Sequence, residues 1–120
     1  PNSGTYSGFR ELAMENKPYA LHFQTSTNYE GIVKAVAQDA GGIGYATIGL
    51  ASKPGVKPVS IGGVAPSVAT VNKGQYPYAR VLRLYTDKAN ETSTAHSFIE
   101  FVQSSRGQKI LDQVSFSPRL

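Results

Sequence analysis

Apolar residues near the start of the chain recur at intervals of three and four, which is the spacing of one helix face. The stripe consists of Phe9, Leu12 and Ala13, and residues 16–18 (Asn-Lys-Pro) end it. It follows a Ser-Gly-Thr sequence at residues 3–5, whose hydroxyls can cap a helix by accepting a free backbone amide. The pattern predicts a helix that begins at this sequence.

Similar stripes predict four more helices. One contains Ile32, Val33, Val36 and Ala37, follows a polar turn at 25–28, and is closed by residues 39–42, where Gly41 and Gly42 permit a left-handed C-cap. A short helix is predicted from about Val68 to Asn72, ended by Lys73-Gly74. The last third of the chain predicts two helices, with stripes at 95–102 and 110–114, separated by Ser104 to Gly107.

Four segments between these helices have strand-like patterns. Residues 19–24 alternate apolar and polar side chains, 43–48 form an apolar run, and 56–61 and 80–86 are rich in β-branched, leucine and tyrosine side chains. Strands that alternate with helices indicate an α/β domain with a mixed or largely parallel sheet.

Composition limits the class of protein. The chain has 120 residues, 40% of them hydrophobic and 17% charged, which fits one soluble globular domain rather than a disordered chain. No apolar run approaches the roughly 20 residues of a membrane span. The formal net charge is +4, but the lysines are spread along the chain, so we expect a solvated surface and no nucleic-acid partner.

Signals for catalysis are lacking in the sequence. With no cysteine there is no disulfide, thiolate metal site or cysteine nucleophile, and His22 and His96 have no ligand partners at metal-binding spacing. The sequence contains no nucleophile elbow and no nucleotide phosphate loop, and the turn at 41–44 lacks the lysine that such a loop needs. We therefore expect a protein that is not an enzyme and needs no metal or cofactor.

The most informative chemical feature is the helix start at Ser3, Gly4 and Thr5. Free amides and the positive end of the helix dipole attract anions there, Gly4 lets an anion approach the backbone, and the two hydroxyls can donate. A plain N-cap is the alternative, and it is the commoner use of such a sequence. Ser26, Thr27 and Asn28 form a second candidate donor set, or simply the cap of the next helix.

Five motifs, in order, resemble one family. They are N-S-G-T at residues 2–5, G-G-I-G-Y at 41–45, G-V-A-P-S at 63–67, Y-P-Y-A-R-V-L-R-L-Y at 76–85, and F-I-E-F-V with G-Q-K-I between 98 and 110. Together they resemble the C-terminal half of the phosphate-binding receptors of ABC importers. The second motif departs from the family pattern, since Gly42 stands where alanine is usual.

The resemblance implies a type II periplasmic-binding-protein fold, in which two α/β lobes close on a ligand. Residues 1–83 would form most of the second lobe, and 84–120 would cross back and pack C-terminal helices on a first lobe that is not in this sequence. It implies phosphate as ligand, held by Ser3, Gly4 and Thr5. It also implies an ABC permease as partner and a periplasmic or extracellular location, with or without a membrane anchor.

Two family features are not found in the 120 residues: the arginine that usually precedes the Ser-Gly-Thr loop, and the first lobe with its own anion contacts. Charge-assisted contacts from arginine are strong, so we expect this chain alone to bind phosphate weakly or not at all. Because Pro1 opens within a turn, we also expect it to be an excised piece whose exposed C-terminal helices favour self-association.

Other functions remain open from sequence. Another oxyanion such as sulfate, molybdate or tungstate would use the same helix start. An interaction, sensor or adhesion module on the same fold would leave the loop unused. A phosphate-transferring enzyme is the least favoured, because the sequence offers no activated nucleophile.

Overall fold

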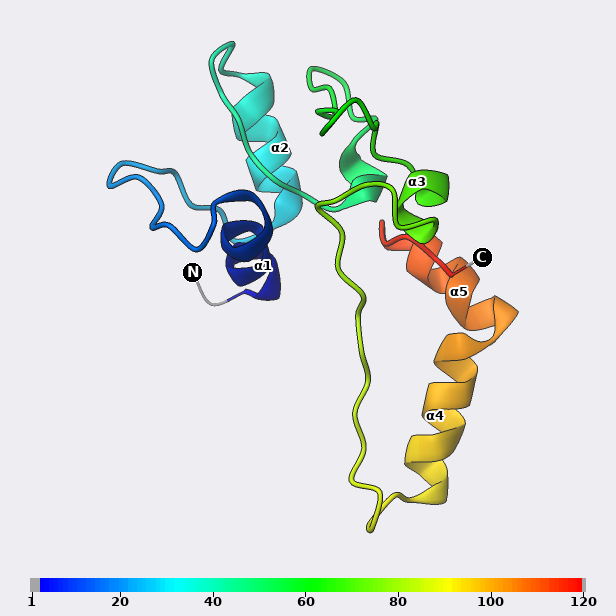
Figure 1. Ribbon diagram of the computed structural model, residues 1–120. Helices are drawn as coiled ribbons and strands as arrows, with labels where there is room; N and C mark the ends of the chain where they lie inside the picture. Colours follow the sequence, from blue (N-terminus) through cyan, green and yellow to red (C-terminus); the bar gives the residue numbers. More distant parts are fainter. Residues whose placement is uncertain (1–2, 120) are drawn as a thin grey trace.

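The computed structural model describes residues 3–119 (Figure 1). The elements in chain order are α1 (Gly4–Ala13), α2 (Tyr29–Ala37), the 3-10 turn η1 (Ile48–Leu50), α3 (Val68–Asn72), α4 (Ser93–Gln103) and α5 (Ser105–Gln113). Each predicted helix is therefore present. No helix within the described range is long and apolar enough to cross a membrane.

The helix boundaries follow from polar caps that close free backbone amides. Ser3, Asn28, Ser67, Thr92 and Ser104 each accept a backbone N–H at the start of their helices. The cap of α3 is reciprocal, since the Thr70 hydroxyl also accepts from the Ser67 amide at 2.9 Å. Gly74 follows α3 with a φ of 67°, as the sequence predicts for a glycine that ends a helix.

Two glycine predictions are wrong. α2 ends at Ala37 with Gln38 in a right-handed conformation, and neither Gly41 nor Gly42 takes the left-handed conformation expected of a C-cap. Gly107 lies inside α5 and not between the helices, because the break is confined to Ser104. A Cβ at Gly107 would lie 2.2 Å from the Phe101 carbonyl oxygen, so the glycine lets α5 start directly against α4.

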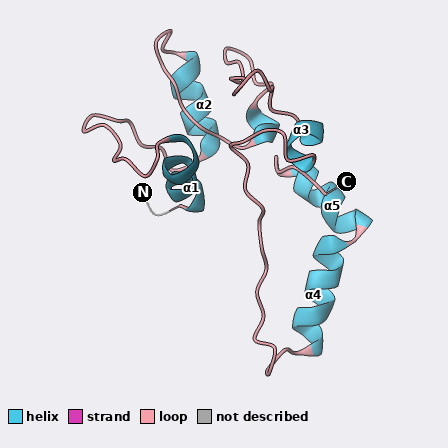
Figure 2. Ribbon diagram, in the orientation of Figure 1, coloured by secondary structure: helices cyan, strands magenta, loops and turns pink. Residues whose placement is uncertain are grey.

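The four predicted strands are not formed within residues 3–119, where Figure 2 shows helices and loops only. An isolated bridge joins Ile61 and Val64 through two bonds of 3.0 Å across a tight turn. A helix forms its backbone hydrogen bonds within its own segment, whereas a strand needs a neighbouring strand about 4.8 Å away. The predicted strand segments 19–24, 43–48 and 80–86 run without such neighbours, so the predicted sheet is not seen.

The molecule is elongated, measuring 50 × 28 × 26 Å with a radius of gyration of 16.5 Å. A compact chain of this length would have a radius near 13–14 Å (about 2.2·N^0.38). From residue 80, whose side chain contacts α1, the chain runs as an extended segment to a turn at 87–90 and returns as α4, which packs against α5 (Figure 1). Asp87 closes the turn by accepting from the Ala89 amide and the Asn90 side chain.

Aromatic rings form the packing centre around α1. Tyr6 stacks on Tyr19 with ring centroids 4.4 Å apart, and Phe9 stacks on Tyr45 at 4.9 Å. The Tyr19 hydroxyl donates to the Tyr6 carbonyl at 2.8 Å. These contacts attach the segments that follow α1 and α2 to one face of α1, and they include Tyr6 in its first turn.

The C-terminal segment after α5 contacts η1 and α3. The Gly49 amide donates to the Ser115 carbonyl at 3.3 Å, and the Asn72 side chain donates to the Pro118 carbonyl at 2.9 Å. Leu50, which is 5% exposed, lies in the turn that Ser115 approaches. The end of the chain therefore contacts η1 and α3, while α4 extends away.

The tyrosine stack predicts an anomalous titration. Burial, and then the nearby Tyr45, raise the pKa of Tyr19 to about 12 from an ordinary 10.0. The folded chain favours the neutral phenol of Tyr19 more than the unfolded chain does. The stability that follows from this preference is fully present below pH 10 and is lost as the pH rises through about 12. We expect phenolate absorbance to show a late step that Tyr19→Phe removes. The exposed Tyr85→Phe variant should keep that step, and its loss there instead would contradict the assignment.

Candidate anion-binding site

The start of α1 presents donors to an open surface. The Ser3 side-chain oxygen accepts the Tyr6 amide at 3.1 Å, and because a hydroxyl has one donor and two acceptor positions, its proton stays available. Nothing lies within 4 Å of where a Cβ on Gly4 would sit, so the backbone there is accessible. The cap and an anion contact are therefore compatible at Ser3.

Thr5 connects this helix start to the start of α2. Its hydroxyl is hydrogen-bonded to the Tyr29 hydroxyl across 24 positions of sequence, and both side chains are half-buried. Figure 1 shows the beginning of α2 beside α1. The contact links the first turns of the two helices through their side chains.

The second candidate set forms the cap of α2. Asn28 accepts the Gly31 amide at 2.7 Å through Oδ1, and Ser26 accepts the Asn28 amide at 3.4 Å. A Cβ on Gly31 would lie 2.1 Å from the Ser26 hydroxyl, so glycine makes room for this turn. Thr27, between Ser26 and Asn28 in sequence, is exposed. The structure thus places Asn28 in a capping role, and Tyr29 next to it reaches Thr5.

The electrostatics of the two helix starts differ. The first turn of α1 contains no acidic residue, so its dipole is not offset there, whereas the first turn of α2 carries Glu30. Negative groups are favoured at a helix N-terminus. An anion near Ser3 and Thr5 would meet the positive end of α1 directly.

Arg80 supports α1 on another side. Its guanidinium donates to the Gly4 carbonyl at 3.3 Å and lies 3.9 Å from the Glu11 carboxylate. A Cβ on Gly8 would lie 2.6 Å from the Arg80 Cδ, so the buried glycine makes room for the arginine. Sequence reasoning identified Arg80 only as part of a motif and missed this contact. It also missed Tyr29, because a contact between distant positions leaves no periodic signal.

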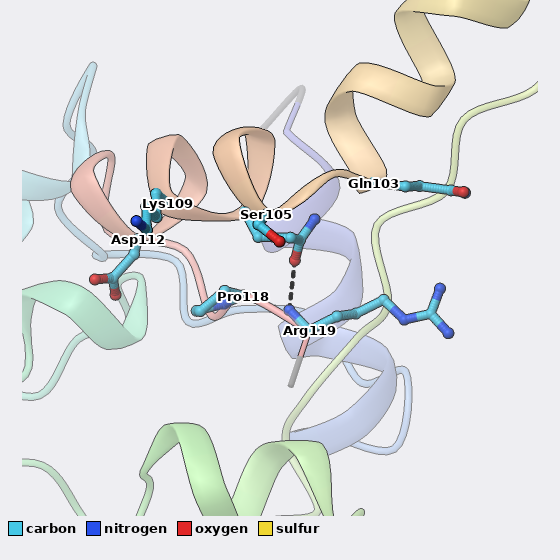
Figure 3. A pocket seen from close by; sticks show the side chains of 7 residues that line it. Gln103, Ser105, Lys109, Asp112, Pro118 and Arg119 are labelled. Carbon is cyan, nitrogen blue, oxygen red and sulfur yellow. Dashed lines mark hydrogen bonds between the residues drawn. The ribbon is translucent and has the colours of Figure 1, made fainter.

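A separate open hollow of about 600 Å³ lies over α5 (Figure 3). It contains the cations Lys109 and Arg119, but their side chains extend to opposite sides and Asp112 lies beside Lys109. Diverging cations do not form a common anion site. Among residues 3–119, no three His, Asp or Glu side chains gather closely enough to hold a metal ion.

The sequence matches the family described as the PBP superfamily domain over residues 1–106. The chain belongs to the PBP superfamily. Similar proteins include the phosphate-binding protein PstS of Borreliella burgdorferi, 28% identical over 96% of this chain and 45% of that protein. PstS 2 of Streptococcus pneumoniae is 32% identical over 95% of this chain and 41% of its own length.

A solved structure supports the same relationship. The phosphate-binding protein of a phosphate ABC transporter from Streptococcus pneumoniae superposes with a TM-score of 0.73 and 26% identity, over 96% of this chain and 47% of that chain. This PBP-superfamily chain therefore has a PBP-like fold, and its resemblance to phosphate-binding receptors is confirmed. It spans less than half the length of the relatives it matches.

The cap at Ser3 predicts a local effect on stability. Ser3→Ala removes the acceptor for the Tyr6 amide, so we expect the free energy of unfolding to fall by about 1 kcal/mol. Urea unfolding followed by circular dichroism measures the change. Ser7→Ala is the matched control, because Ser7 is exposed within α1 and does not cap it. Equal effects of the two substitutions would contradict the capping role.

Proposed function

We propose that this chain provides one half of the phosphate site of an ABC-importer receptor. The observation that carries the proposal is the Thr5–Tyr29 hydrogen bond, which links the first turns of two helices beside an accessible Gly4 backbone. The relatives support the proposal, because the matched proteins are named phosphate-binding proteins. The geometry supports an anion as ligand, and the names of the relatives select phosphate among the anions.

The proposed contacts are those of a hydrogen-bonding anion site. Ser3 and Thr5 donate hydroxyl protons, and the amides at the start of α1 and the backbone of Gly4 face the anion. Ser26, Thr27 and Asn28 supply a second donor set at the start of α2. Every group in this arrangement binds or orients, and none is an activated nucleophile, so the proposal is binding without covalent chemistry.

The proposed architecture has two parts. Residues 1–83 belong to one lobe with a mixed, largely parallel sheet, whose strands 19–24, 43–48 and 56–61 complete their hydrogen bonding with chain outside this sequence. Residues 84–120 cross back, and α4 and α5 pack on the other lobe. The permease partner and a periplasmic or extracellular location, with or without an anchor, complete the proposal.

Thr5 provides the test of phosphate binding. In the intact receptor we expect Thr5→Ala to weaken phosphate binding by about 10- to 100-fold, since a hydrogen bond to a charged group contributes about 1.5–3 kcal/mol. Titration calorimetry measures the affinity. Thr94→Ala on α4 is the matched control and should leave the affinity unchanged.

The same titrations test whether phosphate is the preferred oxyanion and whether residues 1–120 hold only half of the binding site. Sulfate should bind much more weakly than phosphate, and residues 1–120 alone should bind phosphate weakly or not at all. Tighter binding of sulfate, molybdate or tungstate would assign another oxyanion receptor. Absence of anion binding by the intact protein would favour an interaction, sensor or adhesion module.

The extended segment 80–86, at the proposed boundary between the two parts, predicts where the other lobe packs. In the described structure the apolar side chain of Leu82 is 71% exposed. If the proposed lobe covers it, Leu82→Ala should lower the free energy of unfolding of the intact receptor by about 2–5 kcal/mol. The same substitution in residues 1–120 alone should have little effect, and denaturant unfolding measures both.

Arg83→Ala is the control for this experiment, because it shortens the neighbouring exposed side chain of the same segment. We expect it to change stability little in either protein. Equal, small effects of the Leu82 and Arg83 substitutions in the intact receptor would contradict the proposed packing of the extended segment 80–86.

A further inference from the structure

We infer that Tyr29 is a positioning residue for the anion: its hydroxyl holds the Thr5 hydroxyl in the orientation that donates to phosphate. The inference rests on the proposed phosphate site, to which it adds a residue that the Ser-Gly-Thr pattern does not contain. The structural basis is the half-buried hydrogen bond between the two hydroxyls, which joins α1 to α2.

The proton count decides the direction of this bond in the occupied site. A threonine hydroxyl has one proton, so Thr5 cannot donate to Tyr29 and to an anion through the same proton. When phosphate is bound, Tyr29 must therefore donate to Thr5, and Thr5 donates onward to the phosphate oxygen. Hydrogen bonds in such a chain polarise one another, which strengthens the terminal donor.

Tyr29 is well placed for this role. It is the first residue of α2, and its position is set by the Asn28 cap on the Gly31 amide at 2.7 Å. The other end of the bond is fixed because Thr5 lies in the first turn of α1, which Ser3 caps and the Arg80 contact to Gly4 holds. Two capped helices thus fix the distance between the hydroxyls, so the Thr5 rotamer is selected before an anion arrives.

The test is a double-mutant cycle in the intact receptor, with phosphate affinity measured by calorimetry. Tyr29→Phe keeps the ring and should weaken binding by about 3- to 10-fold, the effect of losing one neutral hydrogen bond. Thr5→Val should weaken it more, and adding Tyr29→Phe to Thr5→Val should change it by less than about 2-fold, since the two residues then act through one contact.

The control is Tyr76→Phe, which removes a different tyrosine hydrogen bond, from its hydroxyl to the Val59 carbonyl at 3.2 Å. It should leave phosphate affinity unchanged even where it lowers the melting temperature. Thermal unfolding of all variants without phosphate separates a general loss of stability from a loss of orientation. A purely structural Tyr29 would lower the melting temperature without non-additivity in affinity.

The outcomes separate this inference from the function it rests on. If the wild-type receptor binds phosphate and Tyr29→Phe does not weaken it, Tyr29 is not a positioning residue and the phosphate site stands. If Tyr29→Phe weakens binding equally with and without Thr5→Val, Tyr29 contacts the anion itself, and the positioning role is wrong. If the wild-type receptor does not bind phosphate, the proposed function fails and this inference fails with it.

Discussion

Backbone hydrogen bonding determines which parts of this chain form regular structure. A helix closes its N–H and C=O groups on residues four positions away, so a capped amphipathic segment satisfies its backbone hydrogen bonds within its own sequence. A strand has no such local solution, and its ladder must come from another segment. In residues 3–119 the capped helices are formed, while Val81, Leu82 and Tyr85 lie on an extended segment, each more than 70% exposed.

The same requirement produces the candidate site. The caps that close the first turns of α1 and α2 use the oxygens of Ser3 and Asn28 as acceptors, so capping does not consume the protons of those side chains. A structural cap and an anion contact are therefore compatible uses of one residue. What distinguishes this pair of helix starts from an ordinary cap is the Thr5–Tyr29 bond, because it links the first turn of α2 to the positive end of α1, where no acidic residue offsets the dipole.

The sequence predicts local features well and distant ones poorly. Each helix was predicted, and α3 to within its boundaries, because caps such as Ser67 and the apolar spacing act over a few residues. The exception at Gly107 is instructive, since glycine usually marks a break, and here it permits close contact of α5 with the end of α4. Tyr29 and Arg80 were missed for the opposite reason: their partners in α1 lie 24 and 76 positions away.

The openness of the candidate site is the physical argument for the other lobe proposed above. Ser3 and Gly4 face solvent, and donors in water gain little net free energy from an anion, because the anion gives up equally good hydrogen bonds to water. Removing that water requires a surface that closes over α1 and supplies further donors. The exposed apolar side chains of 80–86 and of α4 need covering for an independent reason, the hydrophobic effect. An additional lobe that packs on 80–86 and on α4 would both exclude water from the site and bury these apolar side chains. Self-association through α4 would bury apolar side chains but would leave the site open.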